Sequence, residues 1–289
     1  EVAMIETSKA FARNIIEGCA PEKNPKRREF KSLVGVESFI NKLNKDYVIK
    51  YDGLMGGKGV KISGEHLASV SDGLKYAQSL VERGGSFLVE EKLIGEDVSL
   101  MSFVDGKTCG HMPIVQDHKR AFEGDLGPNT GGMGTYSFAD HSLPFLKNSQ
   151  VIEAQKTNEL VVKQLLKETG VRFVGVLYGG FMLTGSGIKV IEYNARLGDP
   201  EAMNVLSLMK TDFLKVCGDI VGGALPKDSV EFNGLSTVCK YAVPVGYPNN
   251  PSKDFVVNCN SKDPSIYLAS VRLVKNRVVA CGSRTVAVV

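Results

Sequence analysis

The sequence predicts an α+β protein whose strands pair as antiparallel hairpins. Short β-prone runs are joined by glycine-containing turns, as at Asp105-Gly106 and Gly185-Ser186-Gly187. Longer stretches with apolar residues at helical spacing lie between these hairpins, at about residues 67–83, 150–168 and 201–221. Hairpins that alternate with amphipathic helices favour the α+β class.

Composition and charge are those of an ordinary soluble globular protein of about two domains. The 289 residues are 43% apolar and 23% charged, and the formal net charge is +3. Because this charge is small, it does not indicate nucleic-acid or anionic-membrane binding. The six cysteines form no C-x-x-C pair, and no signal peptide or apolar stretch of ~20 residues is recognisable. We therefore expect reduced thiols, a cytoplasmic location, and no nucleic-acid or membrane partner.

The first elements are a helix and a hairpin with a glycine-rich tip. Apolar residues at helical spacing run from Glu1 to Ile16. The basic run 23–31 resembles an RNA-binding patch, but it lacks an interleaved aromatic platform, which favours a solvated linker. Two β-prone runs, at 47–50 and 60–62, then flank the glycine-rich segment 53–59, which predicts a hairpin with a flexible tip.

The rest of the chain alternates strands, helices and one long polar segment. Residues 116–137 carry six glycines or prolines and many polar groups, which indicates a functional loop. Further strands are predicted at 86–90, 175–184 and 189–194, and short β-prone runs at 235–289. A boundary near Lys227 would give domains of residues 1–227 and 228–289.

The glycine-rich hairpin has residue types that suit a polyphosphate. Lys50 ends one strand, and Lys58 lies eight residues later among glycines whose backbone amides can bind anions. Gly59 follows Lys58 where a P-loop requires Ser or Thr, so the segment is not a P-loop. A mobile hairpin with a solvated lysine is the alternative interpretation.

Carboxylates at two strand ends suit a nucleotide and its metal ion. In the run 89–96 they can accept hydrogen bonds from ribose hydroxyls, although solvated strand ends look the same. Glu192 and Asn194 are two residues apart on a predicted strand, so both point to one face and offer oxygen ligands that suit magnesium. Arg196 would contact a phosphoryl oxygen. The turn R-L-G-D-P-E at 196–201 gathers more charge than packing requires.

The polar segments 116–120 and 127–134 offer exposed amides and three potential cations, which can hold a carboxylate or a phosphate. His118 lies in this polar stretch, where histidine is more often a hydrogen-bonding residue than a general base, so we assign it no proton transfer. The sequence contains no G-x-S-x-G elbow, and we expect no serine nucleophile.

Five segments resemble, in order, the motifs of the phosphoribosylamine–glycine ligases, a family of the ATP-grasp superfamily. They read Y-D-G-L-M-G-G-K-G-V, V-E-E-K-L-I-G-E-D-V-S-L, Q-D-H-K-R, G-P-N-T-G-G-M-G-T-Y-S and I-E-Y-N-A-R-L-G-D-P-E. The resemblance begins at E-T-S-K-A-F-A and continues to V-P-V-G-Y-P. It implies an ATP-grasp fold, in which two α+β subdomains clasp ATP, with a lid subdomain at about 46–110 and a partial β-rich C-terminal domain.

The resemblance implies residue roles, position by position. The implied ATP-binding residues are Lys50, Gly57, Lys58, Gly59, Glu90, Glu91 and Glu96. The implied ligands of Mg²⁺ or Mn²⁺ are Glu192 and Asn194, and the implied catalytic residues are Lys119, Arg120, Arg196 and Asp199. The implied substrate-binding residues are Asp117, His118, Asn129, Thr130, Gly131, Gly132 and Met133.

The family's reaction joins glycine to 5-phosphoribosylamine in de novo purine biosynthesis, with ATP as co-substrate. The glycine carboxylate takes the γ-phosphoryl group of ATP, and the amine then displaces phosphate to give glycinamide ribonucleotide. Such chemistry needs positioning and electrostatic stabilisation rather than an enzyme nucleophile. The resemblance also admits fusion to, or action beside, other purine-synthesis enzymes.

Two departures from the family pattern leave other interpretations open. Met55-Gly56 replaces two alanines in the glycine-rich loop, and Ala202-Met203 replaces Thr-Gln after G-D-P-E. The second change keeps open an ATP-grasp ligase for another carboxylate and amine. Family members carry a further N-terminal domain and a longer C-terminal one, so we also expect this chain to be a fragment of such a protein. A fragment that binds ATP without complete catalysis is therefore an alternative to the full ligase.

Overall fold

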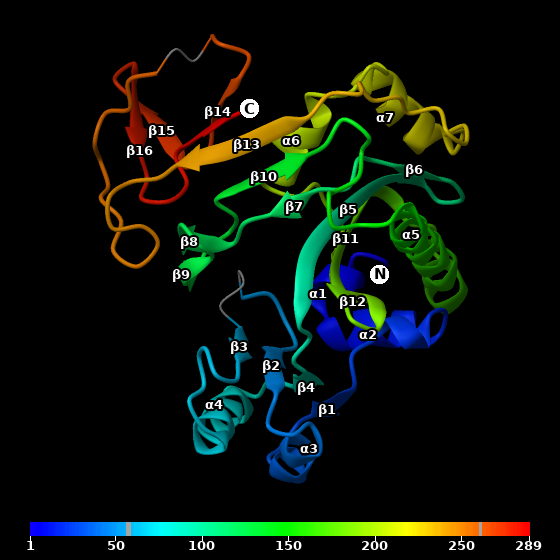
Figure 1. Ribbon diagram of the computed structural model, residues 1–289, viewed down its shortest axis with the longest axis vertical. Helices are drawn as coiled ribbons and strands as arrows, with labels where there is room; N and C mark the ends of the chain where they lie inside the picture. Colours follow the sequence, from blue (N-terminus) through cyan, green and yellow to red (C-terminus); the bar gives the residue numbers. More distant parts are fainter. Residues whose placement is uncertain (56–58, 260–261) are drawn as a thin grey trace.

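The computed structural model describes residues 1–55, 59–259 and 262–289. Within these ranges the backbone forms three larger antiparallel sheets and two separate hairpins, with helices around them (Figure 1). None of the helices in the described ranges is long and apolar enough to cross a membrane.

The small subdomain is a four-stranded sheet covered by two helices, at the bottom of Figure 1. Its strands, in spatial order, are β1 (Arg27–Phe30), β4 (Phe87–Glu91), β2 (Tyr47–Tyr51) and β3 (Val60–Ile62). Its helices are α3 (Val36–Lys42) and α4 (Val70–Glu82). Residues of all these elements except β3 share one apolar core. The predicted hairpin is confirmed, because Lys50 of β2 pairs with Val60 of β3.

The predicted lid range of about 46–110 differs from this subdomain. It omits β1 and α3, which pack into the small core, and it includes two strands of the next sheet. The range missed β1 because Arg27–Phe30 has polar residues at three of its four positions, and the strand is held by its pairing with β4.

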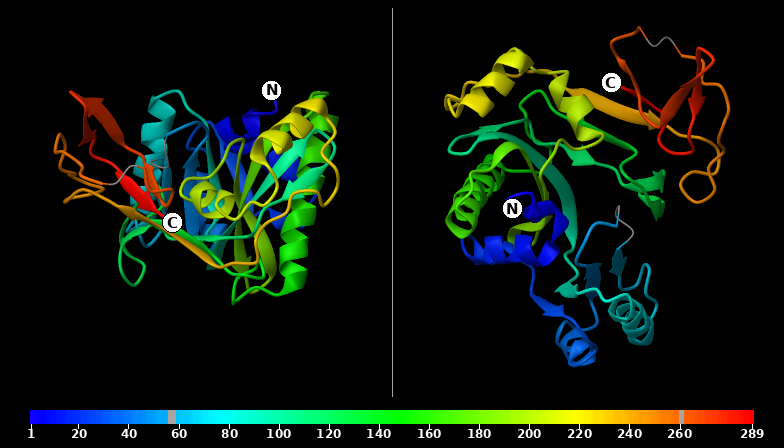
Figure 2. Two further views of the ribbon diagram at one scale, coloured as in Figure 1. Left: turned by 90° about the horizontal axis from the view of Figure 1, so that it is seen from above. Right: turned by 180° about the vertical axis from the view of Figure 1, so that it is seen from behind.

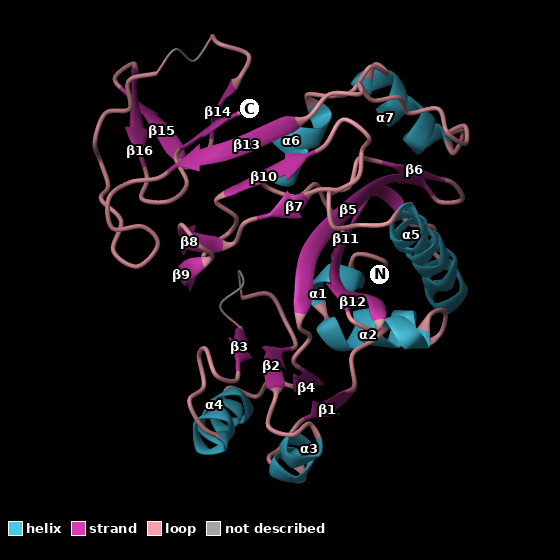
Figure 3. Ribbon diagram, viewed as in Figure 1, coloured by secondary structure: helices cyan, strands magenta, loops and turns pink. Residues whose placement is uncertain are grey.

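The large sheet lies at the centre of the molecule. Its strands, in spatial order, are β12 (Gly187–Asn194), β11 (Val174–Thr184), β5 (Gly95–Asp105) and β6 (Cys109–His111). Successive residues of β5 point to opposite faces: Leu100 enters the core with α1 (Met4–Thr7), α2 (Lys9–Glu17) and α5 (Asn148–Thr169), whereas Met101 enters the core with α6 (Glu201–Leu206) and α7 (Phe213–Gly222). Figure 3 shows α1, α2 and α5 together on one side of this sheet.

The third sheet combines the segment predicted as a loop with the C-terminal part of the chain. Its strands, in spatial order, are β14 (Ile266–Leu268), β17 (Val286–Val288), β13 (Thr237–Ala242), β10 (Gly134–Ser137) and β7 (Gln116–Asp117). The separate hairpins are β8 (Arg120–Phe122) with β9 (Leu126–Asn129), and β15 (Val271–Val274) with β16 (Arg277–Ala280). Figure 2 shows this part from above and from behind. Since β10 pairs with β13, one sheet crosses the boundary predicted near Lys227.

Two predicted helices are divided by side-chain caps. The helix expected from Glu1 to Ile16 is broken at Ser8, whose hydroxyl accepts a hydrogen bond from the Phe11 amide and begins α2. The helix expected at 201–221 is interrupted before Asp212, whose carboxylate accepts from the Lys215 amide and begins α7. A short 3₁₀ helix, η1 (Pro21–Lys23), follows α2.

Candidate active site

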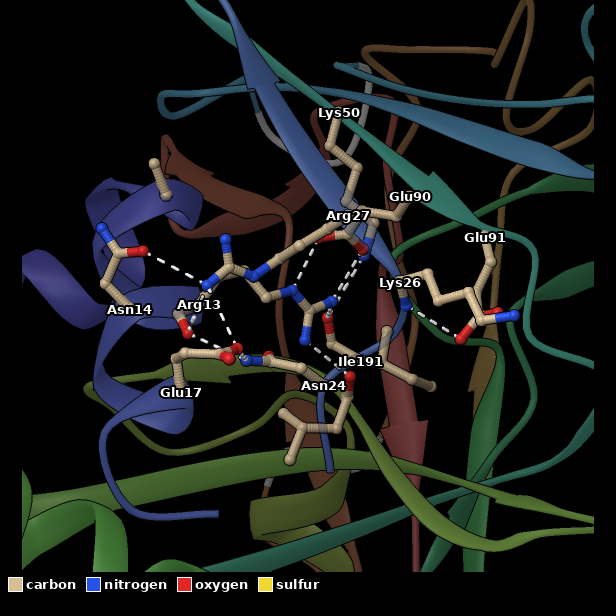
Figure 4. Close-up of polar contacts among 12 residues, drawn as sticks. Arg13, Asn14, Glu17, Asn24, Lys26, Arg27, Lys50, Glu90, Glu91 and Ile191 are labelled. Atoms are coloured by element: carbon tan, nitrogen blue, oxygen red, sulfur yellow. Dashed lines mark hydrogen bonds and ion pairs between the residues drawn. The ribbon is translucent and has the colours of Figure 1, made fainter. Parts of the chain in front are cut away.

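The small subdomain and the large sheet are joined by a buried charge network (Figure 4). Glu90 of β4 is 2% exposed. Its carboxylate accepts hydrogen bonds from Arg13 of α2, at Nε–Oε1 2.6 Å and Nη2–Oε2 2.7 Å, and pairs with Lys50 at Nζ–Oε2 2.8 Å. Burial would raise the pKa of Glu90, but Arg13 and Lys50 outweigh it and lower the pKa to about 2. Both oxygens are engaged, so this geometry does not support Glu90 as an acceptor for ribose hydroxyls.

Lys9 is a second cation near Lys50 that the sequence analysis did not select. Its Nζ donates to the carbonyl oxygen of Gly53, at the base of the glycine-rich loop, at 2.9 Å. Burial lowers the pKa of Lys9, while the charge of Glu192 raises it and that of Lys50 lowers it further. Lys9 therefore shares one electrostatic environment with a predicted phosphate ligand and a predicted metal ligand. Its position in the motif E-T-S-K-A-F-A was the available signal.

The other predicted ATP-binding residues have separate surroundings. Glu91 follows Glu90 in the strand and so points to the opposite face, where its Oε1 accepts a hydrogen bond from the Lys26 amide at 2.9 Å. Glu96 is exposed at the start of β5 and accepts from Gln116 at 3.1 Å. The carbonyl of Gly59 accepts hydrogen bonds from the Tyr51 amide and the Tyr76 hydroxyl. Gly57 and Lys58 lie outside the described residues.

The predicted metal ligands share one face of β12. Glu192 is exposed and Asn194 is half-buried, while Tyr193 between them is buried on the opposite side. Across the sheet, Glu192 pairs with Gly180, which has no side chain to crowd the carboxylate. The described residues contain no group of three His, Cys, Asp or Glu side chains that could hold a metal ion. Two oxygen donors nevertheless fit Mg²⁺, which proteins usually bind through one or two side chains together with substrate phosphates and water.

Arg196 is held beside this pair by the first helix. Its Nε donates to Glu6 Oε1 at 2.9 Å, and its Nη2 lies 3.4 Å from Asn194 Oδ1. The second oxygen of Glu6 accepts from the Ala195 amide. The Arg196 side chain is 55% exposed. Arg196 therefore lies next to the predicted metal ligand Asn194 and is open to solvent, as a contact to a transferred phosphoryl group requires.

Lys119 lies in an acidic environment, called the cluster below, in which the charges of Asp97, Asp117, Glu192 and Glu201 act on its ammonium. Its Nζ is 3.8 Å from Asp97 Oδ2. Burial would lower the pKa of Lys119, but the four carboxylates outweigh it and raise the pKa. Asp97 was not selected from the sequence, although it stands in the motif G-E-D-V-S-L. Burial raises its pKa, and its Oδ1 is buried without a hydrogen-bond partner among the described residues.

Asp117 has the most perturbed carboxylate of this cluster. Burial and the charge of Glu201 raise its pKa to about 8, against the opposing effect of Lys119. Its Oδ1 is also buried without a hydrogen-bond partner among the described residues. Glu201 itself is 3% exposed and accepts a hydrogen bond from the Tyr178 hydroxyl at 2.8 Å. A half-buried acidic site of this kind, with carboxylate oxygens that lack partners among the described residues, suits a cationic or amine-bearing ligand.

The remaining residues predicted to bind substrate mostly support one another. Thr130 donates from its amide and its hydroxyl to the Lys119 carbonyl, at 2.7 and 2.8 Å, and the Met133 amide donates to the His118 carbonyl. A Cβ on Gly132, whose φ is +109°, would lie 2.6 Å from Asp117 Oδ1. Asn129 pairs with Arg120 in the hairpin of β8 and β9. These contacts fix the backbone beneath Asp117 and Lys119.

Two arginines tie this region to other elements. Arg120 Nη2 lies 2.5 Å from Glu65 Oε2 of the small subdomain. Arg284, which the sequence analysis missed, pairs with Asp199 at 2.9 Å and donates to the Gly131 carbonyl at 2.8 Å. Asp199 also accepts from the Tyr241 hydroxyl. Arg284 follows β16 in the C-terminal β-rich region, where no sequence pattern indicated a link to the site.

Comparison with known proteins assigns the family. A family model described as phosphoribosylglycinamide synthetase, ATP-grasp (A) domain, matches residues 7–202. The chain belongs to this family. A phosphoribosylamine–glycine ligase of Methanosarcina barkeri is 48% identical over 99% of this chain and 66% of the relative, and one of Methanosarcina acetivorans is 46% identical over 99% and 65%. The chain thus spans just under two thirds of the length of these relatives.

Solved structures agree with the phosphoribosylglycinamide synthetase family. A crystal structure of phosphoribosylamine–glycine ligase from Thermotoga maritima matches with a TM-score of 0.84 and 30% identity, over 99% of this chain and 71% of that one. An N5-carboxyaminoimidazole synthetase from Staphylococcus aureus, complexed with ADP, matches with a TM-score of 0.63 and 12% identity, over 98% and 66% of the two chains. The second likeness concerns the fold alone. The predicted family and the predicted ATP-grasp α+β fold are confirmed.

The departure at Ala202-Met203 from the phosphoribosylglycinamide synthetase pattern falls at the contact between α6 and the third sheet. Met203 is partly buried against Cys239, Tyr241 and Ala287. The Ala202 amide donates to the Gly198 carbonyl at 3.0 Å. Met203 therefore has a packing role against a cluster that includes Tyr241, whose hydroxyl donates to Asp199.

Proposed function

We propose that this chain is the ATP-grasp part of a phosphoribosylamine–glycine ligase, which joins glycine to 5-phosphoribosylamine at the expense of ATP in de novo purine biosynthesis. The observation that carries the proposal is the placement of two cations at the glycine-rich loop and β12: Lys9 donates to the Gly53 carbonyl at 2.9 Å, and Lys50 donates to the Ile191 carbonyl, next to Glu192, at 3.2 Å. Cations that bind a polyphosphate and a carboxylate that binds its metal ion are needed together for phosphoryl transfer. The names of the relatives indicate the substrates.

The proposed reaction has two steps. A glycine carboxylate oxygen attacks the γ-phosphorus of ATP, the bond to ADP breaks, and glycyl phosphate forms. The amine nitrogen of 5-phosphoribosylamine then bonds to the glycyl carbonyl carbon, phosphate leaves, and the nitrogen releases a proton. Lys9, Lys50 and Arg196 would bind phosphate oxygens and orient the γ-phosphoryl group. Glu192 and Asn194 would hold Mg²⁺ or Mn²⁺, which neutralises phosphate charge when bound.

The acidic cluster would form the substrate side of the site. The unpartnered Oδ1 of Asp117 suits an amino group, and Lys119 suits the carboxylate of glycine or a phosphate. Arg120, Asp199 and the backbone from His118 to Met133 would position these two side chains. A cytoplasmic location, the absence of nucleic-acid and membrane partners, and action beside other purine-synthesis enzymes stay predictions from the sequence.

The test is phosphate release from ATP and Mg²⁺, with glycine and 5-phosphoribosylamine omitted in turn. We expect release to require both substrates and to fall about 100-fold or more in Glu192→Ala, since a metal ligand contributes several kcal/mol to phosphoryl transfer. Glu37→Ala, at an exposed position of α3 in the small subdomain, is the matched control and should leave turnover unchanged.

Other outcomes separate the alternatives. Turnover with another amino acid in place of glycine would indicate a different carboxylate–amine ligase. The chain could also bind nucleotide without turnover. If turnover then appeared on adding the remaining third of a relative as a separate chain, the chain would be an ATP-binding portion of the ligase. Turnover that is equal in the parent chain and Glu192→Ala would contradict the metal site.

A further inference from the structure

The buried network around Glu90 contains a residue that the proposed reaction does not use. Arg13 lies on α2 and is 3% exposed. Its guanidinium donates to both oxygens of Glu90, and also to the carbonyl oxygens of Val190 at 2.7 Å and Ile191 at 2.8 Å. Arg13 therefore connects α2, the small subdomain and the last strand of the large sheet, and Figure 4 shows it and Lys50 directed at the same carboxylate.

Lys50 is only partly engaged by this network. Its ammonium has three N–H donors. Two acceptors lie within reach, Glu90 Oε2 at 2.8 Å and the Ile191 carbonyl at 3.2 Å. No other acceptor for Lys50 is present among the described residues. One donor is therefore left for a ligand, and the side chain is 11% exposed.

The network carries more positive than negative charge, and the excess positive charge lies at Lys50. Arg13 and Lys50 each carry one positive charge, and Glu90 carries one negative charge, so the three groups together carry one positive charge. Arg13 binds Glu90 through two short parallel hydrogen bonds, the geometry in which arginine neutralises a carboxylate best. Without Arg13, Lys50 would be the single partner of a buried carboxylate, and its charge would be compensated within the protein.

We propose that Arg13 is a positioning residue for nucleotide binding, because it neutralises Glu90 and thereby leaves the ammonium of Lys50 available to an anionic phosphate. This inference rests on the proposed function, since it takes ATP as the ligand of Lys50. Arg13 is assigned no contact with the nucleotide, because its guanidinium is engaged by Glu90 and two backbone carbonyls. It acts through the charge balance of Glu90 and through the Ile191 carbonyl, which both cations contact.

The competing explanation is that Arg13 only joins the two sheets. The two explanations differ for a variant that loses Arg13 and the charge of Glu90 together. In Arg13→Met alone, Glu90 neutralises the charge of Lys50, so ATP binding should weaken about tenfold or more. Arg13→Met combined with Glu90→Gln loses the joint but restores one net positive charge at Lys50. Under the proposal this double variant recovers ATP affinity to within about threefold of the parent chain. If Arg13 only held the two sheets together, the double variant would bind ATP as weakly as Arg13→Met.

The experiment measures the dissociation constant of ATP by titration calorimetry for the parent chain, both single variants and the double variant. Thermal unfolding establishes that each variant is folded at the temperature used. Arg28→Met is the matched control. Arg28 is an exposed arginine of β1 in the small subdomain, where it stacks on Phe30 and makes no ion pair with Glu90. Its ATP affinity should equal that of the parent chain.

Glu90→Gln gives an independent arm if Arg13→Met does not fold. It leaves both cations and removes the carboxylate charge, so ATP binding should be unchanged or tighter. Tenfold weaker binding by folded Glu90→Gln, or a double variant as weak as Arg13→Met, overturns the proposal. Lys50→Met separates this failure from that of the proposed function: if the parent chain binds no ATP, or Lys50→Met binds it equally well, the proposed nucleotide site itself is wrong.

Discussion

Two charged regions of this molecule balance charge in opposite ways. One is the joint, formed by Arg13, Lys50 and Glu90, and the other is the cluster around Lys119. At the joint one carboxylate faces two cations, and every oxygen has a partner. In the cluster the charges of four carboxylates act on one ammonium, and one oxygen each of Asp97 and Asp117 has no partner among the described residues. The pKa of Glu90 is lowered to about 2, whereas that of Asp117 is raised to about 8.

The opposite pKa shifts of Glu90 and Asp117 follow from the positive charge that each region supplies. Burial acts on both carboxylates in the same direction, because it disfavours the charged form. Only the network at Glu90 supplies enough positive charge to overcome burial, so the Glu90 carboxylate is fully partnered without a ligand. The cluster lacks positive charge, and a metal ion or a substrate amino group would supply it. The direction of the shift thus distinguishes a carboxylate that lacks counter-charge, Asp117, from one whose counter-charge is supplied within the protein, Glu90.

The largest expected effect comes from breaking the joint. Glu90→Leu leaves Arg13 and Lys50 buried without a counter-charge, so we expect the free energy of unfolding to fall by about 3–5 kcal/mol. Urea unfolding at pH 7 measures it. Glu91→Leu is the matched control. Among the described residues the Glu91 side chain makes one hydrogen bond, which it accepts from the Lys26 amide, so its loss should cost about 1 kcal/mol. Equal losses in the two variants would show that the pairing of Glu90 adds nothing to stability.

The direction of the Glu90 shift also sets a pH dependence. Its folded pKa of about 2 is below the ordinary value of 4.5, so the stability it contributes is present above pH 4.5 and is lost as the pH falls toward 2. Glu90→Gln should therefore flatten acid unfolding in that window.

The second effect concerns the cluster and has the opposite sign. The folded pKa of Asp117, about 8, is above its ordinary value of 3.8, so its contribution is present below pH 3.8 and is lost as the pH rises through 8. We expect the free energy of unfolding of the parent chain to fall by about 1 kcal/mol or more between pH 6 and pH 8.5, and that of Asp117→Asn to stay nearly constant. Urea titrations at both pH values measure it.

The exposed Asp140 provides the control for this comparison, since Asp140→Asn should keep the pH dependence of the parent chain. Saturating Mg²⁺ and ATP should reduce the dependence if the cluster receives positive charge from a ligand. An Asp117→Asn variant with the full dependence of the parent chain would place the titrating group elsewhere.

The two regions also differ in how far the sequence predicted them. Glu192, Asn194 and Arg196 lie along one short stretch of chain, so their spacing on a strand indicated a shared face, and the structure places them together. Arg13 and Glu90 are 77 residues apart, and both lie in segments where local pattern predicted only a helix and a strand end. No local rule links them, because the contact depends on how α2 packs between two sheets.

The fold was predictable for a similar reason. Hairpins and long amphipathic helices follow from local pattern, and β2–β3, β11–β12 and α5 appear where the sequence predicted them. The segment 116–137 was predicted as a loop because its strands are short, polar and rich in glycine. Within the segment β8 pairs with β9 and β7 pairs with β10, and β10 also pairs with the distant β13. Arg284 contacts Gly131 from the far end of the chain, which no local pattern indicates.

The smallest expected effect concerns the ion pair between Arg120, next to Lys119 of the cluster, and Glu65 of the small subdomain. Arg120 and Glu65 are 24% and 29% exposed, so water screens their pair. Burial would raise the pKa of Glu65, but its bond to Arg120 lowers it. A double-mutant cycle of Arg120→Gln and Glu65→Gln, measured by urea unfolding, should give a coupling of about 0.2–1 kcal/mol. A parallel cycle of Lys92→Gln with Glu65→Gln, whose atoms are 3.6 Å apart, should give less. A coupling above about 2 kcal/mol for Arg120 would mean that this pair, like the one at Glu90, fixes the small subdomain in place.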